Sequence, residues 1–220
     1  MTMGNRSSRM AAAMTRLPLV AILRGLRPHE AAPVGWALED AGFALIEVPL
    51  NSPEPFDSIA TLRRQLAPDT LVGAGTVTRL ADVERLRDLG ADLVVMPHAD
   101  TAVIRAAKSA GMLCVPGVAT PTEALAALDA GADALKLFPA ELVTPAVMKA
   151  MRAVLPRGAA LLPVGGITPA SLAPWLRAGA SGFGLGSALY APGADATAVA
   201  RNATDFVRAW RECINESPPN

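Results

Sequence analysis

Short apolar runs alternate along the chain with longer segments in which apolar residues recur at helical spacing. This alternation predicts parallel strands joined by helical crossovers, which restricts the fold to the α/β class. Eight such runs are present, and eight is the strand number of a (β/α)8 barrel. The expected strands are residues 19–23, 44–48, 71–74, 93–96, 113–115, 134–138, 161–164 and 182–185.

The segments between these runs carry helix signals, and several end in Ala-Gly or Leu-Gly, where glycine can adopt the left-handed conformation that closes a helix. An open doubly wound sheet would show the same alternation, but its usual glycine-rich phosphate fingerprint does not follow the first run. We therefore predict a single-domain (β/α)8 TIM barrel with its active site at the carboxyl ends of the strands. The expected helices are residues 28–41, 53–66, 81–89, 101–110, 122–130, 144–155 and 171–178.

The two ends of the chain fall outside this alternation. Residues 1–16 contain an apolar part too short for a signal-peptide core or a membrane span, so we expect a frayed tail or a short capping helix there. Residues 215–220 are polar and end in a proline pair, which predicts a disordered tail. The barrel itself is expected over residues 17–214.

Charge and composition narrow the classes of partner. The formal net charge is +0 and basic residues do not cluster in runs, which argues against nucleic acid and membrane surfaces and favours a small-molecule ligand. Cys114 and Cys213 lie far apart in the sequence, so no disulfide framework is expected and a reducing cytoplasm fits best. His29 and His98 lack metal-ligand spacing, so no metal is expected.

Lys136 is one of only three lysines, and it lies inside an apolar strand with the sequence ALKLFP (residues 134–139). Alternation along the strand would turn Leu135 and Leu137 toward the helices and Lys136 toward the barrel axis. A buried ammonium is costly, so it must be paired, lie near solvent at the barrel mouth, or lose its proton. A neutral amine there would be a nucleophile suited to Schiff-base chemistry, a role that arginine cannot take.

Glu47 is the second charge within an apolar strand, in the sequence FALIEVP (residues 43–49). It would lie at the same barrel mouth, where a carboxylate could exchange protons with an amine, a carbinolamine and a methyl group next to an imine. A structural ion pair between Glu47 and Lys136 explains the two residues equally well. A third alternative is a barrel isomerase in which Glu47 is the base and Lys136 its electrostatic partner.

The seventh and eighth strands both end in glycine-rich loops, at the place where barrels commonly bind phosphate. Glycine lets backbone N–H groups approach an anion closely, and a short helix beginning at Ser187 would direct its positive end inward. We therefore expect a phosphate site that includes Gly165, Gly166, Gly186 and Ser187.

Two further residues follow strands at the same end. Arg24 comes directly after the first strand and could hold a carboxylate through a two-pronged contact, although a structural role is equally compatible with its position. Thr76 comes after the third strand and offers a hydroxyl group beside exposed backbone.

Four motifs in order carry a family resemblance: IEVPLNSP (residues 46–53), GAGTV (73–77), ALKLFPA (134–140) and VGGI (164–167). The chain resembles the class I aldolases that act on 2-keto-3-deoxy-6-phospho sugar acids, over about residues 17–210. The resemblance implies a homotrimer of barrels that uses no cofactor and cleaves its substrate to pyruvate and glyceraldehyde 3-phosphate. It also implies that Lys136 is the Schiff-base residue and Glu47 the acid/base, with a substrate-binding set of Arg24, Thr76, Pro97, Phe138 and Val164.

Two departures from the gluconate-type members of that family bear on the substrate. Those members carry an arginine where this chain has Asn51, and a threonine where it has Val164. Both departures resemble the galactonate branch, in which Arg24 would take over carboxylate binding. Loss of a hydroxyl at Val164 should change how the substrate's own hydroxyl is recognised. The resemblance therefore favours 2-dehydro-3-deoxy-6-phosphogalactonate, with its gluconate epimer or 4-hydroxy-2-oxoglutarate as alternatives. A non-catalytic phosphate-binding barrel is the alternative of a different class.

Overall fold

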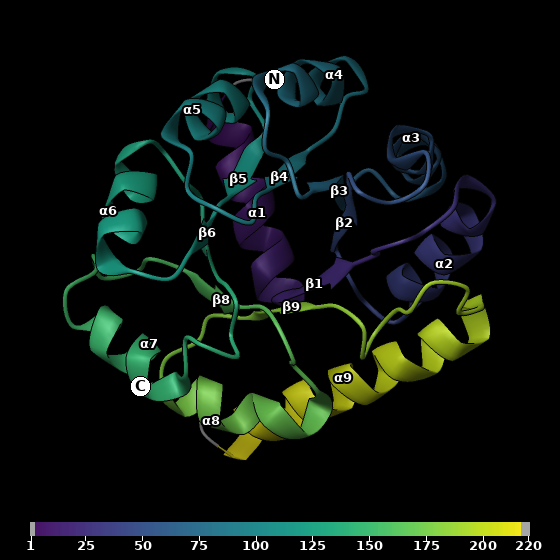
Figure 1. Ribbon diagram of the computed structural model, residues 1–220. Coiled ribbons are helices and arrows are strands. Elements are labelled where there is room, and N and C mark those ends of the chain that lie inside the picture. Colours follow the sequence, from purple (N-terminus) through teal and green to yellow (C-terminus); the bar gives the residue numbers. More distant parts are fainter. Residues whose placement is uncertain (1–2, 217–220) are drawn as a thin grey trace.

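The fold is seen in a computed structural model that describes residues 3–216, and it consists of short parallel strands surrounded by helices (Figure 1). Each strand lies in the inner layer and most are followed by a helix of the outer layer, as the alternation in the sequence predicts. The strands are β1 (Leu19–Ile22), β2 (Leu45–Pro49), β3 (Leu71–Gly75), β4 (Leu93–Val95), β5 (Leu113–Val115), β6 (Gly117–Val118), β7 (Leu135–Leu137), β8 (Leu161–Pro163) and β9 (Phe183–Leu185).

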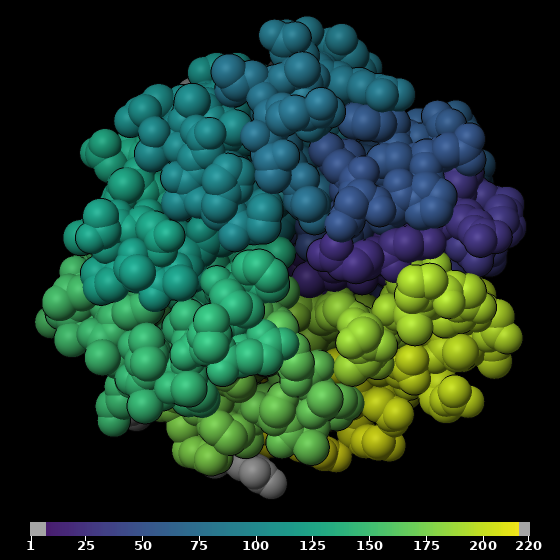
Figure 2. Space-filling view, viewed as in Figure 1, coloured from purple at the N-terminus to yellow at the C-terminus, as the bar shows by residue number. Residues whose placement is uncertain are grey.

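Neighbouring strands follow one another in chain order. One curled sheet has the order β5-β4-β3-β2-β1-β9, and a second has the order β6-β7-β8, with every pair parallel. A doubly wound sheet instead reverses its order beside its first strand, so the open alternative does not describe this chain. The last strand pairs with the first, and the space-filling view shows purple N-terminal segments beside yellow C-terminal ones (Figure 2).

Two local features lie between the sheets. Pro116 separates β5 from β6, because proline has no N–H group to donate to a ladder. Between β8 and β9 a single parallel bridge joins Val164 to Gly184. The carboxyl ends of the strands therefore point the same way in both sheets.

The helices begin and end where local signals place them. Asp100 caps one helix by accepting hydrogen bonds from the N–H groups of Ala102 and Val103, and Thr120 and Glu123 form a capping box on the next. The helices are α1 (Met3–Arg16), α2 (Pro28–Asp40), α3 (Pro55–Gln65), α4 (Leu80–Asp88), α5 (Thr101–Ser109), α6 (Pro121–Asp129), α7 (Pro145–Arg152), the 3-10 turn η1 (Pro169–Ser171), α8 (Leu172–Arg177) and α9 (Ala196–Glu216).

The inside of the strand layer is filled by apolar side chains, and α1 lies across its middle (Figure 1). Met10 and Ala13 of α1 are buried in the same cluster as Val20, Leu45 and Leu162. Residues 1–16 were expected to be a frayed tail or a capping helix, and the second alternative describes residues 3–16. Helix α1 therefore fills part of the interior on the side where Met10 and Ala13 are buried.

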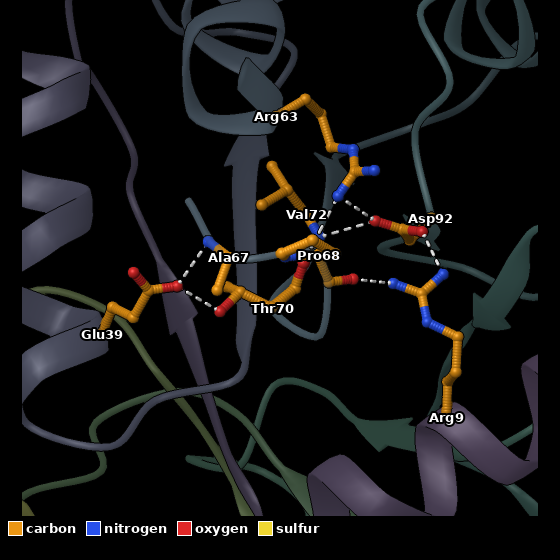
Figure 3. A network of polar contacts seen from close by, with 8 residues as sticks. All are labelled: Arg9, Glu39, Arg63, Ala67, Pro68, Thr70, Val72 and Asp92. Atoms are coloured by element: carbon orange, nitrogen blue, oxygen red, sulfur yellow. Dashed lines mark hydrogen bonds and ion pairs between the residues drawn. The ribbon is translucent and has the colours of Figure 1, made fainter. Parts of the chain in front are cut away.

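A polar network fixes α1 to the amino ends of the strands (Figure 3). Arg9 and Arg63 each lie 2.8 Å from a different carboxylate oxygen of Asp92, the residue that precedes β4. Arg9 also donates a hydrogen bond of 2.7 Å to the carbonyl of Pro68, and Asp92 accepts one of 3.2 Å from the N–H of Val72. The network holds three separate segments at the end opposite the carboxyl ends.

Two expectations from the sequence need correction, and one long helix was not predicted. The segment at Ser187 is a turn rather than a short helix, because the N–H groups of Leu189 and Tyr190 both return to the carbonyl of Gly186. The long helix α9 was not predicted. It continues through Asn215 and Glu216, two residues into the segment expected to be disordered, while residues 217–220 lie outside the described part of the chain.

Within residues 3–216, no helix has both the length and the apolar character needed to span a bilayer.

Candidate active site

Lys136 lies at the centre of β7 with its side chain inside the strand layer. It is 6% exposed, whereas Leu135 and Leu137 are fully buried in the core between strands and helices. Its strand neighbours are Gly117 on β6 and Leu162 on β8. The Nζ atom lies 4.8 Å from the centre of the Phe138 ring, within the range of a cation–π contact.

Glu47 lies on β2, between Ile22 of β1 and Gly73 of β3, and is 1% exposed. Its Oε2 atom is buried without a hydrogen-bond partner among the described residues. Gly75 makes room for this carboxylate, because a methyl group on Gly75 would overlap Oε2. A buried carboxylate oxygen that lacks a protein partner is costly, and such an atom is more often found where a ligand or a proton completes it.

Lys136 and Glu47 share the same interior space, with Val20, Leu45 and Val164 around them. In the part of the chain that the structure describes, no ion pair joins them. The two side chains therefore do not form the structural ion pair that was one alternative from the sequence.

Burial controls the charge of both groups. It lowers the pKa of Lys136, with Arg24 acting in the same direction and the charge of Glu47 opposing it. Burial raises the pKa of Glu47, and the charges of Lys136 and Arg24 oppose that shift. Both shifts favour the neutral form, so the amine is held closer to its nucleophilic state than an exposed lysine is.

A cavity of about 340 Å³ opens beside Lys136 at the carboxyl ends of the strands. It brings together most of the residues that the sequence assigned to the site: Arg24, Lys136, Phe138, Val164, Gly165, Gly166, Gly186 and Ser187. The volume falls in the range of small-molecule sites.

Arg24 lies at the cavity wall directly after β1, and its Nη1 atom donates a hydrogen bond of 3.0 Å to Oδ1 of Asn51. The neighbouring N–H of Gly25 donates one of 2.9 Å to the hydroxyl of Ser52. Two hydrogen bonds thus join the loops after β1 and β2. Asn51, the position where the chain departs from the gluconate-type pattern, is the residue that contacts Arg24.

Thr76 and Pro97 follow β3 and β4 but do not line this cavity. Thr76 is half-buried and has a φ of 57°, which is unusual for a residue other than glycine. The carbonyl carbon of Pro97 would lie 2.6 Å from a methyl group on Gly117, so the chain can pass there only because residue 117 is glycine. A substrate-binding role for Thr76 and Pro97 stays a prediction.

The glycine-rich loop after β8 depends on glycine at two consecutive positions. Gly165 has a φ of 121° and Gly166 a φ of 61°, both in the region that side chains disfavour. Val164 lies just before them. Its N–H donates a hydrogen bond to the carbonyl of Leu137, and its carbonyl accepts one from the N–H of Ala140, each at 2.9 Å. The loop therefore presents its backbone to the cavity from a fixed position.

Sequence reasoning missed several polar residues that line the cavity, among them Glu141 and Tyr190. Tyr190 is buried, and its hydroxyl donates a hydrogen bond of 3.4 Å to Glu30; burial and then the charge of Glu30 raise its pKa to about 12. Glu141 gives only one sequence signal, its place five residues after Lys136. Neither residue belongs to an apolar strand pattern, so the reasoning that found Lys136 and Glu47 could not find them.

Histidine, cysteine and carboxylate residues do not gather elsewhere into a metal site. Among residues 3–216, no group of three or more such side chains is placed to hold a metal ion.

The fold agrees with comparisons to known proteins. The chain belongs to the KDPG and KHG aldolase family of class I aldolases, whose model matches residues 10–204. It is 46% identical over 200 residues to the 2-dehydro-3-deoxy-6-phosphogalactonate aldolase of Escherichia coli K12. The aligned residues make up 91% of this chain and 98% of that relative.

Two further relatives extend the comparison. The chain is 49% identical over 193 residues to a probable 2-dehydro-3-deoxy-6-phosphogalactonate aldolase of Rhizobium meliloti 1021, covering 88% of this chain and 91% of the relative. Among solved structures it superposes on one described as native KDPGal, with a TM-score of 0.89 and 46% identity, over 91% of this chain and 97% of that chain. These similarities cover nearly the whole of both relatives.

Proposed function

We propose that the protein cleaves 2-dehydro-3-deoxy-6-phosphogalactonate to pyruvate and D-glyceraldehyde 3-phosphate through a Schiff base on Lys136. The observation that carries the proposal is a buried, desolvated lysine that faces a cavity lined by two glycine-rich loops, with an unpartnered carboxylate beside it. A nucleophilic amine, a proton carrier and an anion cradle are the parts that this reaction needs.

In the proposed mechanism, neutral Lys136 attacks the C2 carbonyl of the substrate and forms a carbinolamine. Glu47 protonates the departing hydroxyl, so that water leaves and an iminium forms. Glu47, now a carboxylate, takes the proton of the C4 hydroxyl as the C3–C4 bond breaks, and the electron pair of that bond moves into the iminium to give an enamine. The aldehyde leaves, Glu47 returns a proton to C3, and hydrolysis frees pyruvate and Lys136.

The remaining site residues bind the substrate in this proposal. Arg24 pairs with the carboxylate next to C2, in an orientation that Asn51 supports. The phosphate lies against Gly165, Gly166, Gly186 and Ser187, because backbone N–H groups at glycine can approach it closely. Phe138 and Val164 form the apolar wall along the carbon chain, while Thr76 and Pro97 complete the site from the third and fourth strands.

The galactonate epimer is favoured by two lines of support. Relatives of 46% and 49% identity carry that substrate in their names. Val164 also lines the cavity beside Lys136 and offers no hydroxyl to a substrate hydroxyl group. Side-by-side measurement of kcat/KM for the two epimers tests this choice, and a much higher value for the gluconate epimer would overturn it.

We also propose that residues 17–214 form one closed (β/α)8 barrel. The pairing of β9 with β1, the bridge between Val164 and Gly184, and the continuity of the chain through Pro116 support closure. In a closed ring β5 and β6 would count as one strand, which gives the eight strands expected from the sequence.

A homotrimer in the cytoplasm completes the proposal. Leu125 of α6 and Val147 of α7 are 45% and 41% exposed, so two neighbouring helices present apolar side chains that an interface could cover. Cys114 is a buried free thiol, as is usual for proteins of reducing compartments. Light scattering coupled to gel filtration would test the trimer, and a monomeric mass would exclude it.

Trapping with borohydride in the presence of pyruvate tests the chemistry directly. The mass of the modified peptide should place the adduct on Lys136, and Lys136→Arg should fold, lose the adduct and lose cleavage, because a guanidinium is not nucleophilic. A non-catalytic phosphate-binding barrel and a barrel isomerase would both leave no adduct on the wild-type protein. Cleavage by Lys136→Arg at the wild-type rate would contradict the mechanism.

A further inference from the structure

The carboxylate of Glu141 lies against the glycine pair of the proposed phosphate site. A methyl group on Gly165 would overlap Oε2 of Glu141, and one on Gly166 would lie 3.4 Å from Oε1. Both oxygens of the carboxylate are therefore close to the loop after β8. Glu141 also lines the same cavity as Arg24 and Lys136, so its negative charge faces the space that a ligand would enter.

The backbone of Glu141 is held in place, whereas its side chain is not. A turn fixes the backbone, since the N–H groups of Leu142 and Val143 donate to the carbonyl of Pro139 at 3.0 and 3.1 Å. The N–H of Ala140 binds the carbonyl of Val164 at 2.9 Å, which joins this turn to the glycine loop. Within the described residues, no hydrogen bond or ion pair fixes the carboxylate of Glu141, which is exposed and can turn toward solvent.

A phosphate group that bound at the glycine pair would lie close to this carboxylate. Like charges a few ångströms apart repel each other, more strongly where solvent is partly excluded, and a phosphate dianion doubles the interaction. The two anions repel each other, and the glycine pair can be covered by one of them at a time. A phosphorylated ligand must therefore displace the carboxylate.

We propose that Glu141 is an internal competitor for the phosphate site: its carboxylate rests against Gly165 and Gly166 before substrate binds and swings outward when a phosphorylated ligand enters. Glu141 thereby lowers the affinity for phosphorylated substrate and for phosphorylated product without taking part in bond cleavage. The inference rests on the proposed function, because it assigns the glycine loops to phosphate.

Calorimetric titration with inorganic phosphate tests the proposal on the wild-type protein, Glu141→Gln and Glu141→Ala. The matched control is Glu84→Gln, which removes an exposed carboxylate from α4 on the other side of the ring (Figure 1). Both substitutions at residue 141 should tighten phosphate binding about fivefold to tenfold, since about 1 kcal/mol or more of repulsion is removed. Glu84→Gln should bind phosphate as the wild type does.

The KM for the phosphorylated substrate should fall by a similar factor in both variants at residue 141, while the rate of pyruvate trapping by borohydride should not change. Unchanged or weaker phosphate binding by both variants, or an equal gain in Glu84→Gln, would overturn the role of Glu141. Absence of a pyruvate adduct on the wild-type protein would instead overturn the proposed function. The two failures are distinguishable because phosphate titration requires no turnover.

Discussion

Gly75 leaves open the space that the carboxylate of Glu47 occupies, because a methyl group on Gly75 would overlap Oε2 of Glu47. The two residues lie on neighbouring strands, where Gly75 pairs with Pro49 and Glu47 with Gly73. The position of the carboxylate therefore depends on the absence of a side chain at residue 75 of β3.

Gly75→Ala should displace Glu47 and lower kcat by about 100-fold, since a misplacement of about 1 Å in a proton-transfer group can have that effect. Steady-state kinetics of substrate cleavage would measure the loss, and circular dichroism would show that the fold is retained. A kcat for Gly75→Ala within twofold of wild type would show that Glu47 tolerates the displacement.

Glu47→Gln should shift the ionisation of Lys136 to lower pH. The charge of Glu47 raises the pKa of Lys136 against the lowering caused by burial, so removing that charge leaves the lowering unopposed. The neutral amine should then persist at a lower pH than in the wild type. Reductive methylation followed across pH, with the Lys136 peptide quantified by mass spectrometry, would report the midpoint.

Lys149, an exposed residue of α7, is the internal control for that experiment, and its labelling should be the same in both proteins. A midpoint for Lys136 that stays in place or moves to higher pH would mean that the carboxylate does not act on the amine.

Val164→Thr should move the substrate preference toward the gluconate epimer by about tenfold in relative kcat/KM, because it adds one hydroxyl to the cavity wall at nearly constant volume. The backbone of residue 164 is held on both sides by hydrogen bonds, so the new hydroxyl should take the position of a methyl group. Kinetics with both epimers would measure the change. An unaltered ratio would locate epimer recognition elsewhere in the cavity.

Arg9→Ala should lower the free energy of unfolding by about 1–2 kcal/mol, since it removes a partly buried ion pair with Asp92 and a hydrogen bond to the carbonyl of Pro68. Cleavage activity should not change, because Arg9 lies at the end opposite the cavity. Urea denaturation would measure the loss. Arg16→Ala is the matched control: its ion pair with Asp69 is exposed, and removing it should change stability by less than about 0.5 kcal/mol.

The strands and most helices could be predicted because their signals are local. Each of the eight apolar runs overlaps a strand, and glycine or a capping residue marks most helix ends. The helix α9 escaped prediction because no strand follows it, so the alternation that marked the other helices ends before it. The turn at Ser187 was mistaken for a helix because a glycine-rich loop suits both structures, and contacts outside the segment select between them.

The sequence by itself determined that Lys136 and Glu47 face inward, since a charged residue whose strand neighbours are apolar and face the helices has only the other side to occupy. It also indicated the two glycine-rich loops, because clustered glycines mark backbone conformations that other residues disfavour. Only the tertiary structure decided that Gly75 makes room for Glu47, that Asn51 contacts Arg24 and that Glu141 reaches the glycine pair. These relationships join residues on different strands or loops, and their distances follow from how the strands curl and pair, which local periodicity does not encode.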